Sequence, residues 1–128
     1  MLHGVMKNMS DGAWTLIEAA AQNRRLFVSD ISYWEVSLKA TKGQLVLPTH
    51  PTLWLGQASR APGVQGLALT RDVLIQSTLL RGEPHADPAD RMLIAQAQLS
   101  GLSLLTCDAR IIAYAEKQTG VPVCDARR

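Results

Sequence analysis

Three acidic residues stand where the topology of an α/β protein could gather them. Glu35 comes shortly after the apolar run "RLFVS", Asp90 lies in the corner "PHADPADRMLIAQAQ", and Asp108 directly follows "LSLLTC". In open parallel sheets, sites form at the carboxyl ends of the strands. For Glu35 and Asp108, convergence follows from that rule. For Asp90 it is an inference, because its helix leads into the strand that precedes Asp108.

Converging carboxylates indicate a particular chemistry. Like charges within a few ångströms repel, so such a cluster is tolerated only when protons or cations neutralise it. Mg²⁺ and Mn²⁺ prefer oxygen ligands, and a few carboxylates commonly hold them together with substrate phosphates. Such a site suits phosphodiester hydrolysis. The sequence has no zinc-spaced Cys/His set, glycine-rich phosphate loop or serine nucleophile elbow that would favour another chemistry.

Each acid also has a simpler interpretation as a helix cap. Ser32 and Glu35 have the spacing of a capping box. Asp87 precedes a proline and is typical of an N-cap, and Asp90 then favours the positive end of the helix dipole. Asp108 fits a turn or the N-cap of "ARIIAYAEK". The coincidence of three acids favours the metal hypothesis, with Asp87 as the cap and Asp90 as a ligand.

Helices and short strands alternate along the chain. Apolar residues recur at helical spacing in the longer segments, and short apolar runs between polar residues indicate strands. The predicted helices are 12–25, 30–43, 51–61, 71–82, 90–99 and 109–120, and the predicted strands are 25–29, 64–70, 102–108 and 121–125. Such alternation implies a mainly parallel sheet covered by helices on both faces.

Composition agrees with one globular domain. The chain has 128 residues, is 47% hydrophobic and carries a formal charge of +2. It has no apolar run of the about 18 residues that would span a bilayer, so we expect a cytoplasmic protein without membrane contact. The two cysteines, Cys107 and Cys124, are typical of reduced core residues.

Three blocks of the sequence resemble a known family. The W-E block "VSDISYWEVSLKATKGQLVLP", and the D-P-x-D-R and T-x-D blocks within "HADPADRMLIAQAQLSGLSLLTCDARI", are similar to PIN-domain ribonucleases, specifically the VapC toxins of type II toxin–antitoxin systems. The similarity runs from Leu26 to Val123. It implies a PIN-like three-layer α/β sandwich over a single domain, residues 1–128, with a central, mainly parallel sheet flanked by helices.

The resemblance also implies a site and partners. Glu35, Asp90 and Asp108 match the family's acids that chelate Mg²⁺ or Mn²⁺ and cut RNA, and Thr106 matches the threonine that supports the acidic site. The substrate class is structured RNA such as tRNA. The expected protein partners are a second copy, forming a homodimer, and a cognate VapB-like antitoxin in the acidic groove.

The chain departs from the family pattern at its start. The family begins with a strand that carries an "LDT"-like aspartate as the first metal ligand, and neither Asp11 nor the segment "MLHGVMKN" matches it. We therefore expect the family's first strand to be missing. The alternative function is a truncated, catalytically inactive PIN-like protein that acts only as an interaction module.

Other residues of interest receive weaker interpretations. His85 is not taken as a ligand, because hard cations do not prefer imidazole. The tryptophans, including Trp34, are interpreted as core or interface residues. Candidates for holding RNA phosphates are Arg24, Arg25, Lys39, Lys42, Arg91 and Arg110.

Overall fold

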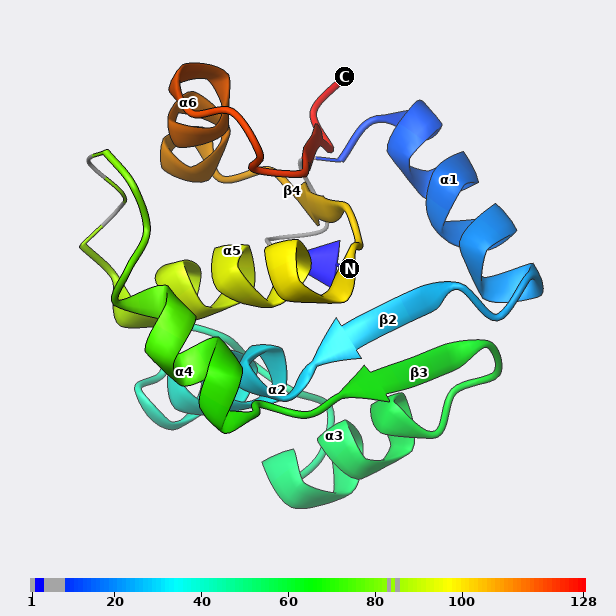
Figure 1. Cartoon of the computed structure of the whole chain (residues 1–128). Coiled ribbons are helices and arrows are strands. Elements are labelled where there is room, and N and C mark those ends of the chain that lie inside the picture. Colours follow the sequence, from blue (N-terminus) through cyan, green and yellow to red (C-terminus); the bar gives the residue numbers. More distant parts are fainter. Residues whose placement is uncertain (1, 4–8, 83, 85) are drawn as a thin grey trace.

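Six helices and five strands make up the part of the chain that the structure describes, namely residues 2–3, 9–82, 84 and 86–128 (Figure 1). The structure is a computed structural model. In chain order the elements are β1 (Leu2–His3), α1 (Asp11–Gln22), β2 (Leu26–Ser29), α2 (Asp30–Thr41), α3 (Pro51–Ser59), β3 (Val64–Leu67), α4 (Arg71–Ser77), α5 (Pro88–Ser100), β4 (Leu104–Thr106), α6 (Ala109–Lys117) and β5 (Val123–Asp125).

The strand pairs of the described residues are all parallel. β4 lies between β1 and β5, while β2 pairs with β3 as a separate two-stranded sheet. β1 also contacts β2, so the two sheets run side by side. The predicted α/β class is confirmed, although the hydrogen-bonded ladder is divided rather than continuous.

The two-residue strand β1 was not expected from the sequence. Leu2 lies opposite Leu105 and His3 opposite Thr106, so the N-terminus pairs in parallel with β4. Two residues are too short to give a periodic signal, which explains why no strand was predicted there. Neither residue carries a carboxylate, so β1 does not supply the acid that the family's first strand carries.

Helices cover both faces of β4, which makes the layers of the sandwich. Successive strand residues point to opposite faces. Leu104 packs into the larger core cluster together with residues of α5 and α6, whereas Leu105 packs with Ala13 of α1 and Ala126. Cys107 and Cys124 are free, but they are half-buried and pack against this smaller cluster rather than inside it.

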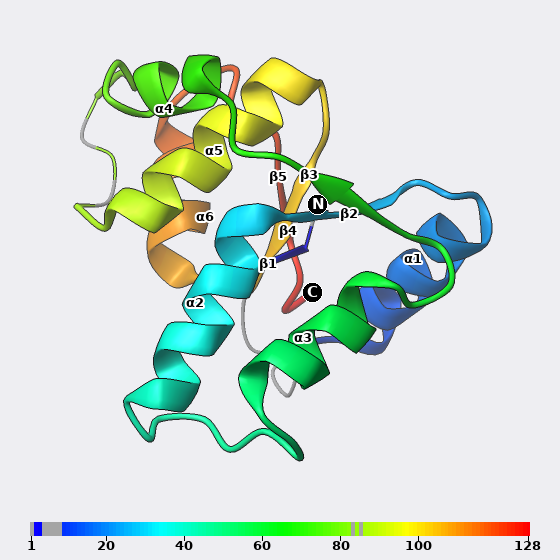
Figure 2. The same ribbon diagram turned by 90° about the horizontal axis from the view of Figure 1, so that it is seen from below.

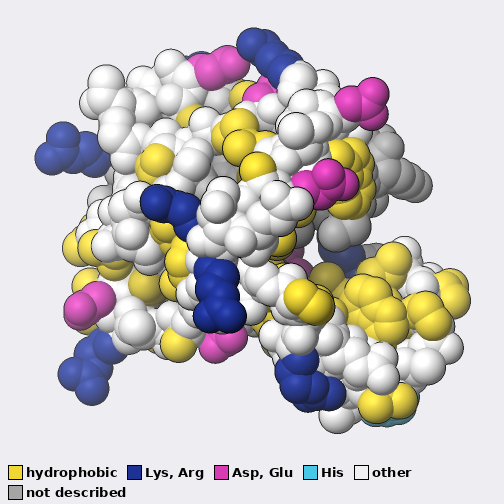
Figure 3. All heavy atoms as spheres, turned by 90° about the vertical axis from the view of Figure 1, so that its right-hand side faces the viewer, with side chains coloured by type: hydrophobic (Ala, Val, Ile, Leu, Met, Phe, Trp, Pro, Cys, Tyr) yellow, Lys and Arg dark blue, Asp and Glu magenta, His cyan; other side chains and the backbone are white. Residues whose placement is uncertain are grey.

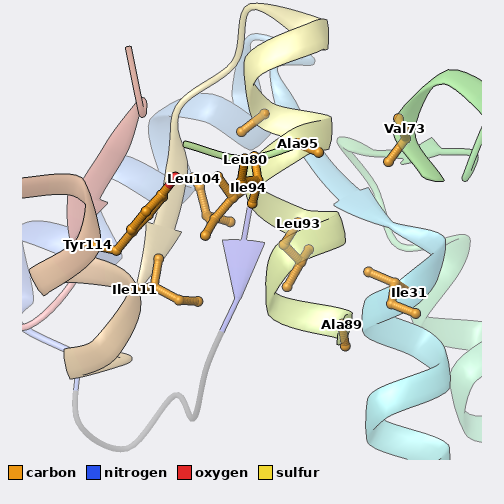
Figure 4. Packing of buried hydrophobic residues seen from close by; sticks show 11 residues of the cluster. Ile31, Val73, Leu80, Ala89, Leu93, Ile94, Ala95, Leu104, Ile111 and Tyr114 are labelled. Atoms are coloured by element: carbon orange, nitrogen blue, oxygen red, sulfur yellow. The ribbon is translucent and has the colours of Figure 1, made fainter. Parts of the chain in front are cut away.

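Helix α5 is the centre of the larger core (Figure 4). Leu93, Ile94, Ala95 and Ala97 are completely buried, and Ile31 of α2 points toward Leu93. Burial of one large aliphatic side chain stabilises a fold by about 1.5–3 kcal/mol, so these contacts hold α5 firmly. The N-terminal end of α5, which carries Asp90, is thereby fixed against α2.

Helix ends follow the predicted signals in most places. Asp87 caps α5, and Gly101 ends it in the left-handed conformation with φ 65°. Several helices end earlier than predicted, among them α1 at Gln22 rather than residue 25, α6 at Lys117 rather than residue 120, and α4 at Ser77 rather than residue 82. The difference is largest for α4. The Ser77 and Thr78 hydroxyls donate to the carbonyls of Leu74 and Ile75, and such local hydrogen bonds compete with helix continuation.

Candidate active site

Glu35 lies in the second turn of α2 and is half-buried. The cap of α2 is Ser29, whose Oγ accepts a hydrogen bond from the Ile31 N–H at 3.3 Å. Ser32 and Glu35 therefore do not form a capping box, because that motif requires its serine at the N-cap. The capping-box interpretation of Glu35 is therefore wrong.

Ser32 is a residue whose role the sequence did not reveal. Its Oγ is buried and has no hydrogen-bond partner among the described residues. Residues three apart lie on the same face of a helix, so Ser32 shares a face with Glu35. In the sequence, the spacing Ser-x-x-Glu was the only sign that Ser32 and Glu35 are related, and it fitted a capping box.

Asp90 occupies the third position of α5 and is 4% exposed. The prediction that Asp87 caps α5 is confirmed. Asp87 Oδ1 accepts hydrogen bonds from the N–H groups of Ala89 at 2.8 Å and Asp90 at 3.4 Å. The carboxylate of Asp90 is thus not needed to cap the helix, although it lies near the positive end of the helix dipole.

Asp108 joins β4 to α6. Its Oδ1 accepts from the N–H groups of Arg110 at 2.8 Å and Ile111 at 3.2 Å, so it is the N-cap of α6. Thr106, fully buried, accepts the Asp108 N–H on its Oγ1 at 3.0 Å and so shapes the turn that presents this acid. The second carboxylate oxygen of Asp108 makes neither capping bond.

Packing places the elements that carry the three acids next to one another. α2 contacts α5, with Ile31 beside Ala89 and Leu93, and α5 contacts β4 (Figures 2 and 4). Ile111, one turn after Asp108, belongs to the same core cluster. Within the described ranges, however, no three His, Cys, Asp or Glu side chains form a group that could hold a metal ion. His85 lies outside the described residues.

The donor chemistry of these acids fits a hard cation. Glu35, Asp90 and Asp108 offer carboxylate oxygens, which Mg²⁺ and Mn²⁺ prefer, and Asp90 is a carboxylate almost removed from water. The side chains of the described residues form no group that could hold a metal ion by itself. Water and phosphate oxygens would therefore supply the remaining ligands of the cation. This is how Mg²⁺ is commonly bound at phosphate-processing sites.

A mostly apolar cavity of about 420 Å³ is lined by Trp34 and Ala89, the chain neighbours of Glu35 and Asp90. Trp34, next to Glu35, lines it and is 54% exposed, so this tryptophan is not a core residue. The cavity is lined by residues of α2 and α5 together with the segment from β3 to α4, among them Asp30, Trp34, Leu69, Leu74, Asp87 and Met92.

On the face that Figure 3 shows, lysine and arginine side chains are dispersed among uncharged and acidic ones. Of the six candidates for phosphate contact, Arg91 is half-buried, and its Nε donates to the Ser77 carbonyl at 3.2 Å. The other five are exposed.

Comparison with known families identifies one domain. Residues 8–117 match the family model described as PIN domain. Searches of the curated proteins and of the solved structures each found no match. None of the helices in the described part of the chain is long and apolar enough to cross a membrane.

Proposed function

The chain belongs to the PIN domain family, whose members are in general nucleases that use divalent metals, and we propose that it is an Mg²⁺-dependent endoribonuclease. The observation that carries the proposal is the family match over most of the chain, combined with three acids on elements that pack together. Under this proposal Glu35, Asp90 and Asp108 hold one or two Mg²⁺ or Mn²⁺ ions, and structured RNA such as tRNA is the substrate.

The reaction is hydrolysis of a phosphodiester. Water attacks phosphorus in line, a new P–O bond forms, and the bond to the 3′ oxygen breaks, which leaves a 5′-phosphate and a 3′-hydroxyl. An Mg²⁺ or Mn²⁺ ion held by Glu35, Asp90 and Asp108 would lower the pKa of the attacking water and offset charge on the phosphoryl oxygens. Asp90, which is 4% exposed, would shield its part of the site from bulk water, whereas Glu35 and Asp108 are half-buried.

Two further residues act through the acids rather than on the substrate. The Thr106 hydroxyl fixes the backbone of Asp108, and the Asp87 cap holds the helix turn that carries Asp90. Both are positioning residues in this proposal. Exposed arginine and lysine side chains contact the phosphates of the RNA outside the acidic centre.

Cleavage of RNA by the purified chain tests the proposal. We expect Mg²⁺- or Mn²⁺-dependent cleavage of tRNA, and a loss of about 10–100-fold or more in Asp90→Asn, because removal of a ligating charge weakens metal binding. The matched control is Asp72→Asn, since Asp72 lies in the first turn of α4 but is exposed. This variant should cleave like the parent.

Two results would count against a nuclease. One is the absence of cleavage with either metal across several RNAs. The other is equal activity of Asp90→Asn and the parent. Either result would favour the alternative, a catalytically inactive interaction module.

The same proposal includes a toxin role with a VapB-like antitoxin as the partner. The cavity of about 420 Å³ supports it, because apolar walls beside Asp30 and Asp87 suit a helix with apolar and basic side chains. Trp34→Glu should abolish co-purification with the antitoxin while the far-ultraviolet circular dichroism stays unchanged. Retained co-purification would place the antitoxin elsewhere.

A homodimer belongs to this proposal as well. Leu74, Ile75 and Leu79, on α4 and just after it, are 42%, 51% and 63% exposed. Contact with a second copy would remove these exposed apolar side chains from water.

A further inference from the structure

A larger cavity, of about 590 Å³, lies at the other end of α5. It is bounded by the end of α4 and the segment after it, the C-terminal turn of α5, and the end of α6 with the loop into β5. Ala97, in its wall, is seven residues after Asp90, which corresponds to about 10 Å along a helix. The cavity is therefore separate from the acidic site.

Hydrogen bonds between distant segments build the cavity. The Tyr114 hydroxyl donates to the Arg81 carbonyl, which ties α6 to the segment after α4. The Gln98 Nε2 donates to the Gly120 carbonyl at 3.2 Å, which ties α5 to the loop before β5. The buried residues Leu80, Ala97 and Tyr114 form its floor, and Figure 4 labels Leu80 and Tyr114.

The polar groups of the cavity are cationic or neutral. Arg81 is the only charged residue among the described residues that line it. Gln76, Gln98 and Gln118 add three amide side chains. Gln98 Oε1 is buried and has no hydrogen-bond partner among the described residues.

We propose that this cavity binds a nucleotide. Arg81 holds the phosphate, since guanidinium matches phosphate geometry. The glutamine amides carry both donors and acceptors, as recognition of a base edge requires. The apolar floor and the adjoining Val121 and Pro122 receive the face of the base. The volume lies within the about 300–1,000 Å³ of small-molecule sites.

Calorimetric titration of AMP, GMP, CMP and UMP into the whole chain tests the site. At least one nucleotide should bind saturably, and Arg81→Gln should weaken it about tenfold or more. Because Tyr114 bonds to the Arg81 backbone carbonyl, this substitution leaves that hydrogen bond in place. The matched control is Arg71→Gln, an exposed arginine at the start of α4 outside the cavity lining, which should bind like the parent.

Two smaller probes separate the parts of the ligand. Inorganic phosphate alone and adenosine alone should each bind more weakly than the best nucleotide. Saturable binding by none of the four nucleotides at millimolar concentration would overturn the proposal. Equal affinity in Arg81→Gln and the parent, or phosphate binding as tight as nucleotide binding, would also overturn it.

A short RNA distinguishes a free nucleotide from a nucleotide within a strand. The RNA is titrated into the Asp90→Asn chain with and without Arg81→Gln. Weaker binding of both RNA and mononucleotide with Arg81→Gln would identify a strand as the natural ligand. Weaker binding of the mononucleotide alone would identify a free nucleotide. The experiment measures binding without cleavage, so failure of the proposed nuclease activity would leave this inference standing.

Discussion

At the scale of the residue, Asp125 has a well-defined electrostatic environment. Arg127 Nε and Nη2 donate to Oδ1 and Oδ2 of Asp125, each at 2.9 Å, and Arg128 Nε lies 3.4 Å from Oδ2. The hydrogen bonds from the Arg127 side chain are the largest cause that lowers the pKa of Asp125 from 3.8 to about 2, although burial opposes them. The carboxylate thus anchors the C-terminal residues to β5.

The shifted pKa predicts a pH-dependent contribution to stability. A carboxyl whose pKa is lower in the folded state stabilises the fold at pH values above its unfolded pKa, and this contribution is lost as the pH falls from about 4 to about 2. Asp125→Asn should therefore lower the free energy of unfolding at pH 7 by about 1 kcal/mol, because Arg127 is partly exposed. Urea unfolding at pH 7, 4 and 2.5 measures the difference between variant and parent, which should shrink toward the lowest pH. A difference that stays constant would contradict this origin.

Single residues were also where the sequence was most informative about the site. The types and spacing of Glu35, Asp90 and Asp108 identified the candidates, and the roles of Asp87 and Asp108 as caps followed from local rules that depend only on neighbouring residues. The sequence did not reveal that Ser32 lies inside a helix, because Ser32 and Glu35 also have the spacing of a capping box. Only the start of α2 at Asp30 shows that Ser32 is not the N-cap.

At the scale of the element, the turn at Gly63 fixes how β3 approaches α1. Gly63 has φ +80°, and a Cβ added there would lie 2.3 Å from the Ala21 carbonyl oxygen, which is backbone and cannot move away cheaply. The left-handed conformation and the close approach both require glycine at this position.

Gly63→Ala should lower the free energy of unfolding by about 2 kcal/mol or more, from left-handed strain and from the displaced backbone. Gly66→Ala is the matched control, since Gly66 lies in β3 and an added Cβ meets nothing within 4 Å. Chemical unfolding of the two variants compares them directly. Equal stability of both would show that the backbone near Ala21 yields easily.

Helix positions were largely predictable, whereas the end of α4 and the strand β1 were not. The signal at Asp87, which precedes a proline, lies directly at the start of α5, so sequence alone located that start well. α4 ended early because the Ser77 and Thr78 hydroxyls bond to carbonyls of their own turn. β1 was missed because its two residues gain their conformation from pairing with β4, which is a contact distant in the sequence.

At the scale of the whole molecule, the fold brings its two cavities to opposite ends of α5. The cavity of about 420 Å³ lies at the N-terminal end, and that of about 590 Å³ lies beside the C-terminal turn. The parallel α/β class was predictable from alternating elements. The division of the described strands into two hydrogen-bonded sheets was not predictable. It depends on the pairing of the two-residue strand β1 with β4, which is a contact distant in the sequence.

Under the proposed function, Glu35, Asp90 and Asp108 together hold a divalent metal. The most direct test is calorimetric titration of Mn²⁺ into the purified chain, Asp90→Asn and the control Asp72→Asn. We expect saturable binding to the parent and to Asp72→Asn, and binding weaker by about 10–100-fold in Asp90→Asn. Binding that is absent from all three proteins, or equal in all three, would contradict the claim and leave the three acids with structural roles.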